Sequence, residues 1–153
     1  MQFQNQYQFQ AYQQASHNVG KGKQIIMLYD GVIRFVQQGE SAHEKGEIEQ
    51  RFNSLQKAMN IITGLQSSLD MQNYPEISTS LYDYYEMIYI KLNGLIKGEK
   101  TNYDEVIGEI KKMRDAWVFA DESQVVLNSN VASNNAFIAP MVANEAGSFA
   151  ITA

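Results

Sequence analysis

The sequence predicts an all-α protein, an antiparallel four-helix bundle with a flexible N-terminal arm and a C-terminal tail. Apolar residues recur every three or four positions in four successive segments of residues 23–117, as they do on one face of a helix. The chain contains two prolines, Pro75 and Pro140, so long stretches are free to be helical. No strand-like alternation competes over residues 23–117, and short loops between amphipathic helices favour antiparallel neighbours.

Composition divides the chain into an arm at 1–22, a bundle domain at 23–117 and a low-order extension at 118–153. The segment from Met1 to Gln14 contains seven glutamines interleaved with aromatics. Their early alternation has a strand-like period, but such composition is more typical of an arm, either docked or loose. Residues 115–153 contain four acidic residues and no lysine or arginine, and they are rich in Asn, Ser and Ala.

The first helix is predicted over 23–45 and the second over 48–69. Gly31 and Gly39 in the first helix are poor helix formers that allow close contact between helices, and Gly46 is a natural terminator. The apolar stripe of the first helix comprises Ile25, Leu28, Tyr29, Val32, Phe35, Val36 and Ala42. The stripe of the second comprises Ile48, Phe52, Leu55, Met59 and Ile62.

The third helix is predicted over 78–97, after a loop at 70–76. Ser78 is a good N-cap for it and Gly98 a good terminator. Its apolar stripe comprises Ile77, Leu81, Tyr84, Ile88, Leu92 and Leu95. The fourth helix begins at an Asn102 cap, and its apolar positions follow a heptad spacing through Tyr103, Val106, Ile110, Met113 and Trp117.

The composition argues against several function classes. The chain has no cysteine, which excludes disulfides and thiolate chemistry, and its net charge of −5 argues against nucleic acid as a partner. No apolar run approaches the roughly 20 residues that span a bilayer, so no membrane insertion is expected, and the N-terminus does not resemble a secretory signal. We expect no cofactor and no enzymatic activity.

One motif has metal-ligand spacing. Glu40 and His43 form a Glu-x-x-His pattern, but a di-iron bundle needs this motif on two helices and a glutamate from each of the other two. The other histidine, His17, has no glutamate three residues before it. A solvated helix face is therefore the better interpretation, and a metal-dependent bundle enzyme is the weaker hypothesis.

Tyrosines and methionines are abundant in the helical segments. Tyr82, Tyr84 and Tyr85 spread around one helix, so they cannot all face one core. Such side chains are enriched at adaptable binding surfaces. Any one of these tyrosines and methionines fits an ordinary core or rim position. As a group they favour a groove that binds a helix.

Several segments of the chain resemble the flagellar secretion chaperone family FliS. The most specific is Met27-Leu28-Tyr29-Asp30-Gly31, following Tyr12-Gln13-Gln14. Further segments begin at Lys57-Ala58-Met59-Asn60 and Ile77-Ser78, and the closing helix ends in Met113-Arg114-Asp115-Ala116-Trp117. The resemblance covers roughly residues 12–117 and includes no counterpart of the extension.

The resemblance implies a cytoplasmic bundle that binds the C-terminal helical region of flagellin. Such a protein prevents premature polymerisation and delivers flagellin to the export gate of the flagellar type III apparatus. By position, the resemblance implies client contacts at Tyr12, Ile25, Met27, Leu28, Tyr29, Leu81 and Tyr85. We add Tyr89 to these expected contacts, because it continues the tyrosine stripe of the third helix. Leu28, Leu81 and Trp117 fit the core equally well. The chain departs from the family at two places. It has Gly20-Lys21-Gly22-Lys23 where the family often has a proline, and it has Tyr84 where the family usually has leucine.

Two further questions stay open at the level of sequence. A helical scaffold that self-associates, as a homodimer for example, or binds another amphipathic helix is the alternative function. The extension could be disordered, dock in the client groove, or bind a third protein. Residues 1–114 carry 12 basic and 13 acidic residues, so the nearly neutral bundle is expected to select its partner by apolar fit more than by charge.

Overall fold

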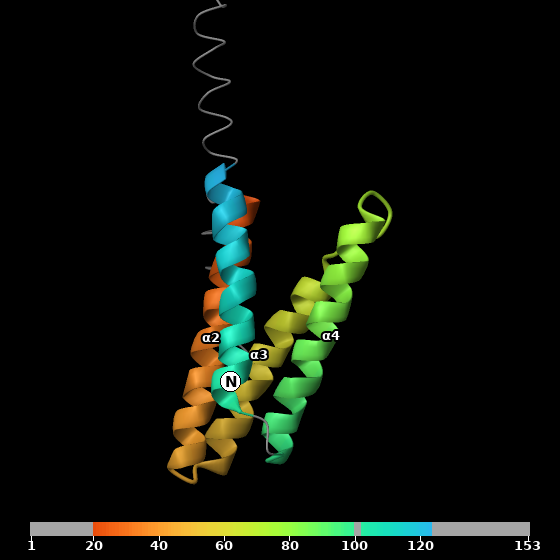
Figure 1. Ribbon diagram of the computed structural model, residues 1–153. Helices are drawn as coiled ribbons and strands as arrows, with labels where there is room; N and C mark the ends of the chain where they lie inside the picture. The colour runs from red at the N-terminus through yellow and green to blue at the C-terminus, as the bar shows by residue number, and fades with distance from the viewer. Residues whose placement is uncertain (1–19, 100–101, 124–153) are drawn as a thin grey trace, which may run out of the picture. The chain divides into compact units, whose positions relative to one another are not determined.

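The computed structural model describes residues 20–99 and 102–123, and these form helices joined by short turns (Figure 1). The helices are α2 (Lys21–Glu44), α3 (Ile48–Ser67), α4 (Pro75–Lys97) and a last helix over 103–123. The described part of the chain contains no strand. This confirms the predicted all-α four-helix bundle, while the proposed arm and tail fall almost entirely outside the described residues.

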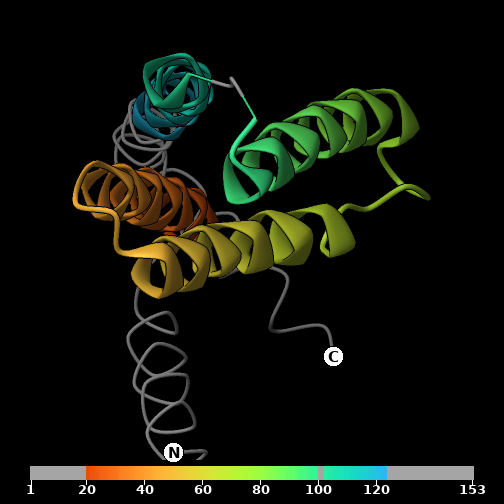
Figure 2. The ribbon, with the colours of Figure 1, turned by 90° about the horizontal axis from the view of Figure 1, so that it is seen from below.

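The helices share one core, and the view in Figure 2 shows them arranged around it in chain order. α2 packs against α3, and α3 packs against α4. Residues 103–118 of the last helix close the arrangement through contacts with both α4 and α2. Lys91 on α4 donates to the carboxylates of Glu105 and Glu109 at 2.8 and 2.7 Å, and Arg114 donates to Asp30 on α2 at 2.8 Å.

Glycines end α2 and α4, as the sequence predicts. Gly46 and Gly98 have φ values of 72° and 76°, in the left-handed region that glycine enters without steric cost. After each glycine the next backbone N–H turns back to the helix: Glu47 donates to the Ala42 carbonyl and Glu99 to the Gly94 carbonyl, both at 2.9 Å. These bonds satisfy carbonyls that the helix ends would otherwise leave unpaired.

Other helix boundaries differ from the prediction. α4 begins at Pro75 rather than after a Ser78 cap, because proline at the first helical position has a suitable φ and lacks an N–H that would be unpaired anyway. Ser78 lies inside the first turn, where its buried hydroxyl donates to the Asp70 carbonyl at 2.9 Å. α2 begins at Lys21 and the last helix continues through residue 123, since no proline or glycine interrupts residues 118–123.

The core takes side chains from every described helix. Its largest fully buried members are Tyr29, Tyr85, Leu55, Ile62, Ile88, Leu92, Leu95, Ile110, Val32, Val36 and Val106. Three residues of the predicted stripes are instead exposed: Ile48 by 72%, Ile77 by 61% and Phe52 by 48%. Ile48 and Ile77 lie in the first turns of their helices, where the neighbouring helices cover less of the apolar face. No helix in the described ranges is long and apolar enough to cross a membrane.

Candidate helix-binding groove

An open groove of about 860 Å³ runs between α2 and α3. On α2 it is lined by Lys21, Gln24, Ile25, Met27, Leu28, Gly31, Arg34 and Phe35. On α3 it is lined by Asn60, Ile61, Gly64, Leu65 and Ser68. The α3 positions repeat at intervals of about one helical turn, so they form one continuous face. From Lys21 to Phe35 the groove follows α2 for about 21 Å, at roughly 1.5 Å per residue.

Two glycines shape this groove in opposite ways. A Cβ at Gly31 would lie 3.2 Å from Cδ1 of Ile61, so the missing side chain lets α2 and α3 approach closely. A Cβ at Gly64 would meet no heavy atom within 4 Å, so the missing side chain there leaves space open. Glycine inside a helix costs about 1 kcal/mol relative to alanine. Gly64 therefore weakens α3 but deepens the groove.

The walls of the groove are apolar and only partly covered. Ile25, Leu28 and Phe35 pack their inner sides against the core and remain partly accessible, while the Met27 side chain is 47% exposed. Methionine is flexible and polarisable, so it adapts to partners of different shape. The groove thus combines a fixed floor with an adaptable edge, as a surface for an amphipathic helix requires.

Positive charge flanks the groove. The Arg34 guanidinium lies 5.3 Å from the centroid of the Phe35 ring, and the Lys57 ammonium from α3 lies 5.6 Å from the same centroid. Lys21 lines the groove near the start of α2. No carboxylate is among the described side chains that line it. The groove therefore has an apolar floor and cations toward both ends.

A buried tyrosine pair lies in the core that supports the groove. The hydroxyls of Tyr29 and Tyr85 are 2.9 Å apart and hydrogen bonded, and both side chains are almost fully buried. Burial raises the pKa of the Tyr29 phenol far above its usual value, and the contact with Tyr85 raises it further. Burial also raises the pKa of Tyr85. Both phenols are therefore neutral near pH 7 and act here as packed, hydrogen-bonded core residues.

The structure brings three of the expected client-contact residues together in this groove: Ile25, Met27 and Leu28. The others lie elsewhere. Tyr29 and Tyr85 are buried, Leu81 is half-buried against the core, and Tyr89 on α4 is 37% exposed but does not line the groove. Tyr12 lies outside the described residues.

Sequence reasoning missed the α3 side of the groove, which comprises Asn60, Ile61, Gly64, Leu65 and Ser68. It also missed the contributions of Lys21 and Arg34 at the rim. A signal was present, because Gly64 interrupts an otherwise regular helical stripe and glycine is a poor helix former.

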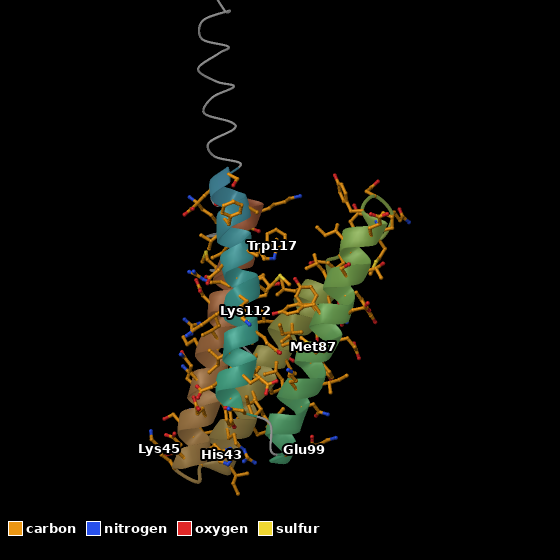
Figure 3. The ribbon with its side chains drawn as sticks, viewed as in Figure 1. His43, Lys45, Met87, Glu99, Lys112 and Trp117 are labelled. Carbon is orange, nitrogen blue, oxygen red and sulfur yellow. The ribbon has the colours of Figure 1, made fainter. Side chains whose placement is uncertain are left out.

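Of the Glu40–His43 motif, His43 makes a local contact with the last helix. His43 Nδ1 lies 3.2 Å from the Tyr103 hydroxyl, and the two rings meet edge to face. Burial raises the pKa of the Glu40 carboxyl, and the nearby carboxylates of Asp104 and Glu44 add to this shift. His43 lies near Lys45 at one end of the bundle, far from Trp117 (Figure 3). Within the described ranges no group of three or more histidine, aspartate or glutamate side chains could hold a metal ion.

The fold and this groove together define a class of protein. A helical bundle with an open apolar groove between two helices is suited to hold an amphipathic helix of a partner. Among the described residues, the groove lining contains no histidine or carboxylate to take part in acid–base chemistry. The fold and the groove are therefore those of a helical bundle with a surface suited to a partner helix.

Comparison with known proteins gives the particular family. The family model described as "Flagellar protein FliS" matches residues 3–124, so the chain belongs to the FliS family. The flagellar secretion chaperone FliS of Bacillus subtilis (strain 168) is 35% identical over 126 residues, which cover 81% of this chain and 92% of that protein. The flagellar secretion chaperone FliS of Salmonella typhimurium (strain LT2) is 32% identical over 95 residues, covering 61% of this chain and 70% of that protein.

Proposed function

We propose that the protein is an export chaperone that binds the C-terminal helical segment of flagellin in the groove between α2 and α3. The groove is the single observation that carries this proposal, since its length of about 21 Å suits roughly 14 residues of helix. Membership of a family of flagellar secretion chaperones supplies the export context.

Occupation of the groove accounts for the protective role of such a chaperone. An amphipathic segment exposes an apolar stripe that promotes self-association in water. Seating that stripe against Ile25, Leu28 and Ile61 removes it from water and from other copies of the client. Binding also orders the client at a cost in free energy, so an extended contact surface is required.

In this proposal the protein works in the cytoplasm and carries its client to the gate of the flagellar type III export apparatus. It acts by binding alone, without catalysis or a cofactor. Ile25, Met27 and Leu28 contact the client directly, whereas Tyr29 and Tyr85 hold the core beneath the contact surface. The supporting feature is that both helices of the groove pack on one core cluster, which keeps the groove preformed.

Gly64→Trp tests where the client binds. The new ring meets no atom at its Cβ and extends into the groove, so the bundle should keep its melting temperature while the groove is filled. We expect the affinity for a purified C-terminal fragment of flagellin to fall at least tenfold, or about 1.4 kcal/mol. Isothermal titration calorimetry with the full-length chain measures this change.

The matched control is Gly108→Trp. Gly108 is also a helical glycine whose added Cβ would meet nothing within 4 Å, but it does not line the groove. This variant should bind the flagellin fragment like the unaltered protein. If folded Gly64→Trp binds as tightly as Gly108→Trp, the client does not use this groove and the proposed site is wrong.

A further inference from the structure

We propose that the groove selects helices that carry carboxylates at the two ends of their apolar stripe. This inference rests on the proposed function, because it takes the α2–α3 groove as the client site. It concerns which amphipathic helices the groove prefers. It also modifies the expectation, drawn from the nearly neutral bundle, that apolar fit counts more than charge in the choice of partner.

The first observation is the pair of cations at Phe35. Arg34 from α2 and Lys57 from α3 both lie close to the centre of this ring, at 5.3 and 5.6 Å. Both side chains are exposed, and neither has a carboxylate partner among the residues that the structure describes. Two like charges held near the same ring attract an anion placed beside them.

The second observation is the contrast with the cations that join helices elsewhere on the bundle. Lys91 is held by two glutamates, and Arg114 is held by Asp30 and Asp115. Their positive charges are already compensated within the fold. At the groove, by contrast, Lys21, Arg34 and Lys57 have no carboxylate partner within the described ranges, although the chain as a whole carries a net charge of −5.

The positions of the cations set the spacing that a client must match. Lys21 and Arg34 are about 13 residues apart on α2, which is about 20 Å along the helix axis. A helix lying along the groove spans the same length with about 14 residues, or four turns. Its carboxylates would therefore lie about four turns apart and would flank an apolar stripe that sits over Gly64.

The charge of the rim discriminates against the opposite client. A helix with lysines at the same positions would place like charges beside Arg34 and Lys57, and like-charge contacts lower affinity. Exposed ion pairs contribute little individually, so selectivity depends on both ends acting together. The apolar floor supplies affinity, and the cations decide which apolar helices are preferred and in what alignment.

Three synthetic peptides test this inference with the full-length protein, each about 18 residues long, or about five turns of helix. They share one amphipathic stripe and carry Glu, Gln or Lys at two positions about 14 residues apart, to match the length of the groove. We expect the Glu peptide to bind roughly tenfold more tightly than the Lys peptide, with the Gln peptide between them. The preference should shrink when the salt concentration rises from about 50 to about 500 mM, because salt screens exposed charges.

Charge reversal at the rim supplies the matched variants. Arg34→Glu combined with Lys57→Glu should abolish or reverse the preference for the Glu peptide. Lys111→Glu combined with Lys112→Glu is the control, because these exposed lysines on the last helix do not line the groove and should leave the preference unchanged. Circular dichroism checks that each variant keeps its helical content.

The outcomes separate this inference from the proposed function. The charge inference is overturned if all three peptides bind equally. It is also overturned if a flagellin fragment binds the Arg34→Glu/Lys57→Glu variant as tightly as it binds the unaltered protein. Neither outcome contradicts the proposed function. If no peptide binds while the flagellin fragment does, the charge inference is again wrong. The proposed function itself is wrong if a flagellin fragment fails to bind the unaltered, folded protein.

Discussion

Tyr29 and Tyr85 show how single residues can look like binding residues in the sequence and serve the core in the fold. Each phenol buries a large ring, and each hydroxyl finds its partner in the other at 2.9 Å. Buried hydroxyls without a partner are costly, so a hydrogen-bonded pair is compatible with an otherwise apolar core. Tyr84 packs edge to face on Tyr85 and ties this pair to the last helix through the Glu109 carbonyl.

A double-mutant cycle measures the coupling between these two tyrosines. Tyr29→Phe removes one hydroxyl and leaves the Tyr85 hydroxyl without this partner, so the free energy of unfolding should fall by about 1–2 kcal/mol. Tyr85→Phe should cost a similar amount. The double variant removes both hydroxyls and should lose less than the sum of the single losses. Urea unfolding followed by circular dichroism gives all four values.

The exposed Tyr82 provides the control for this cycle. Its ring is 42% exposed, so Tyr82→Phe should change the free energy of unfolding by less than about 0.5 kcal/mol. Strictly additive losses at Tyr29 and Tyr85 would mean that their hydroxyls do not depend on each other in solution. In that case the hydrogen bond between Tyr29 and Tyr85 would not explain why these two tyrosines lie in the core.

At the scale of the helices, glycines decide how closely α2 and α3 approach and where they separate. A Cβ at Gly39 would lie 2.9 Å from Cγ of Leu55, a fully buried side chain with little room to move. A Cβ at Gly64 would meet nothing within 4 Å. The same residue type thus closes the interface at one position and opens a groove at the other.

Alanine substitutions at these two glycines should change the free energy of unfolding in opposite directions. Gly39→Ala improves helix propensity but forces Leu55 away, so the free energy of unfolding should fall by about 1–3 kcal/mol. Gly64→Ala raises the helix propensity of α3 without a steric clash, so the free energy of unfolding should rise by about 0.5–1 kcal/mol. Thermal and urea unfolding of the two variants beside the unaltered chain measure both changes. Equal effects at both positions would contradict the packing described for α2 and α3.

The sequence predicts the helices well because periodicity and glycine terminators act locally. The stripe of α2 and the ends at Gly46 and Gly98 depend on residues within a few positions of one another, and the structure confirms them. The start of α4 was wrong because a serine cap and a proline at the first helical position compete within the same four residues. Local signals alone do not rank these two alternatives.

The groove was harder to predict because it depends on which flank of a helix its neighbours leave uncovered. Periodicity identifies the apolar face of α3, but Ile61 at the edge of that face and Leu55 at its centre look alike in the sequence. Their difference arises from the tertiary packing of α2 against α3. Likewise, the burial of Tyr29 and the exposure of Met27 two residues earlier follow from how α2 is rotated in the bundle.

At the scale of the whole molecule, charge is distributed unevenly in two respects. Residues 115–153 hold four acidic residues and no basic one, which accounts for −4 of the net charge of −5. Within the bundle, Lys91 and Arg114 are paired, while the cations at the groove have no carboxylate partner among the described residues. The nearly neutral total of residues 1–114 therefore conceals a local positive field at the surface where we propose that the client binds.

Removal of residues 125–153 tests whether the bundle works without most of the extension at 118–153. The family model ends at residue 124, and among the residues that the structure describes the core cluster and its packed neighbours lie between Ile25 and Trp117. We therefore expect the shortened chain to keep its melting temperature within about 4 °C, which corresponds to roughly 1 kcal/mol in a domain of this size. Its affinity for the flagellin fragment should stay within about twofold, a change of roughly 0.4 kcal/mol.

A full-length chain with residues 125–153 in scrambled order separates the effect of their sequence from that of their length. If the shortened and the scrambled chains both bind flagellin at least tenfold more tightly, the native sequence of this segment competes with the client. A large fall in melting temperature in both would instead make the segment part of the folded unit. Unchanged binding and melting in both would place the whole of the client site within the bundle, where all the described residues that line the groove belong to α2 and α3.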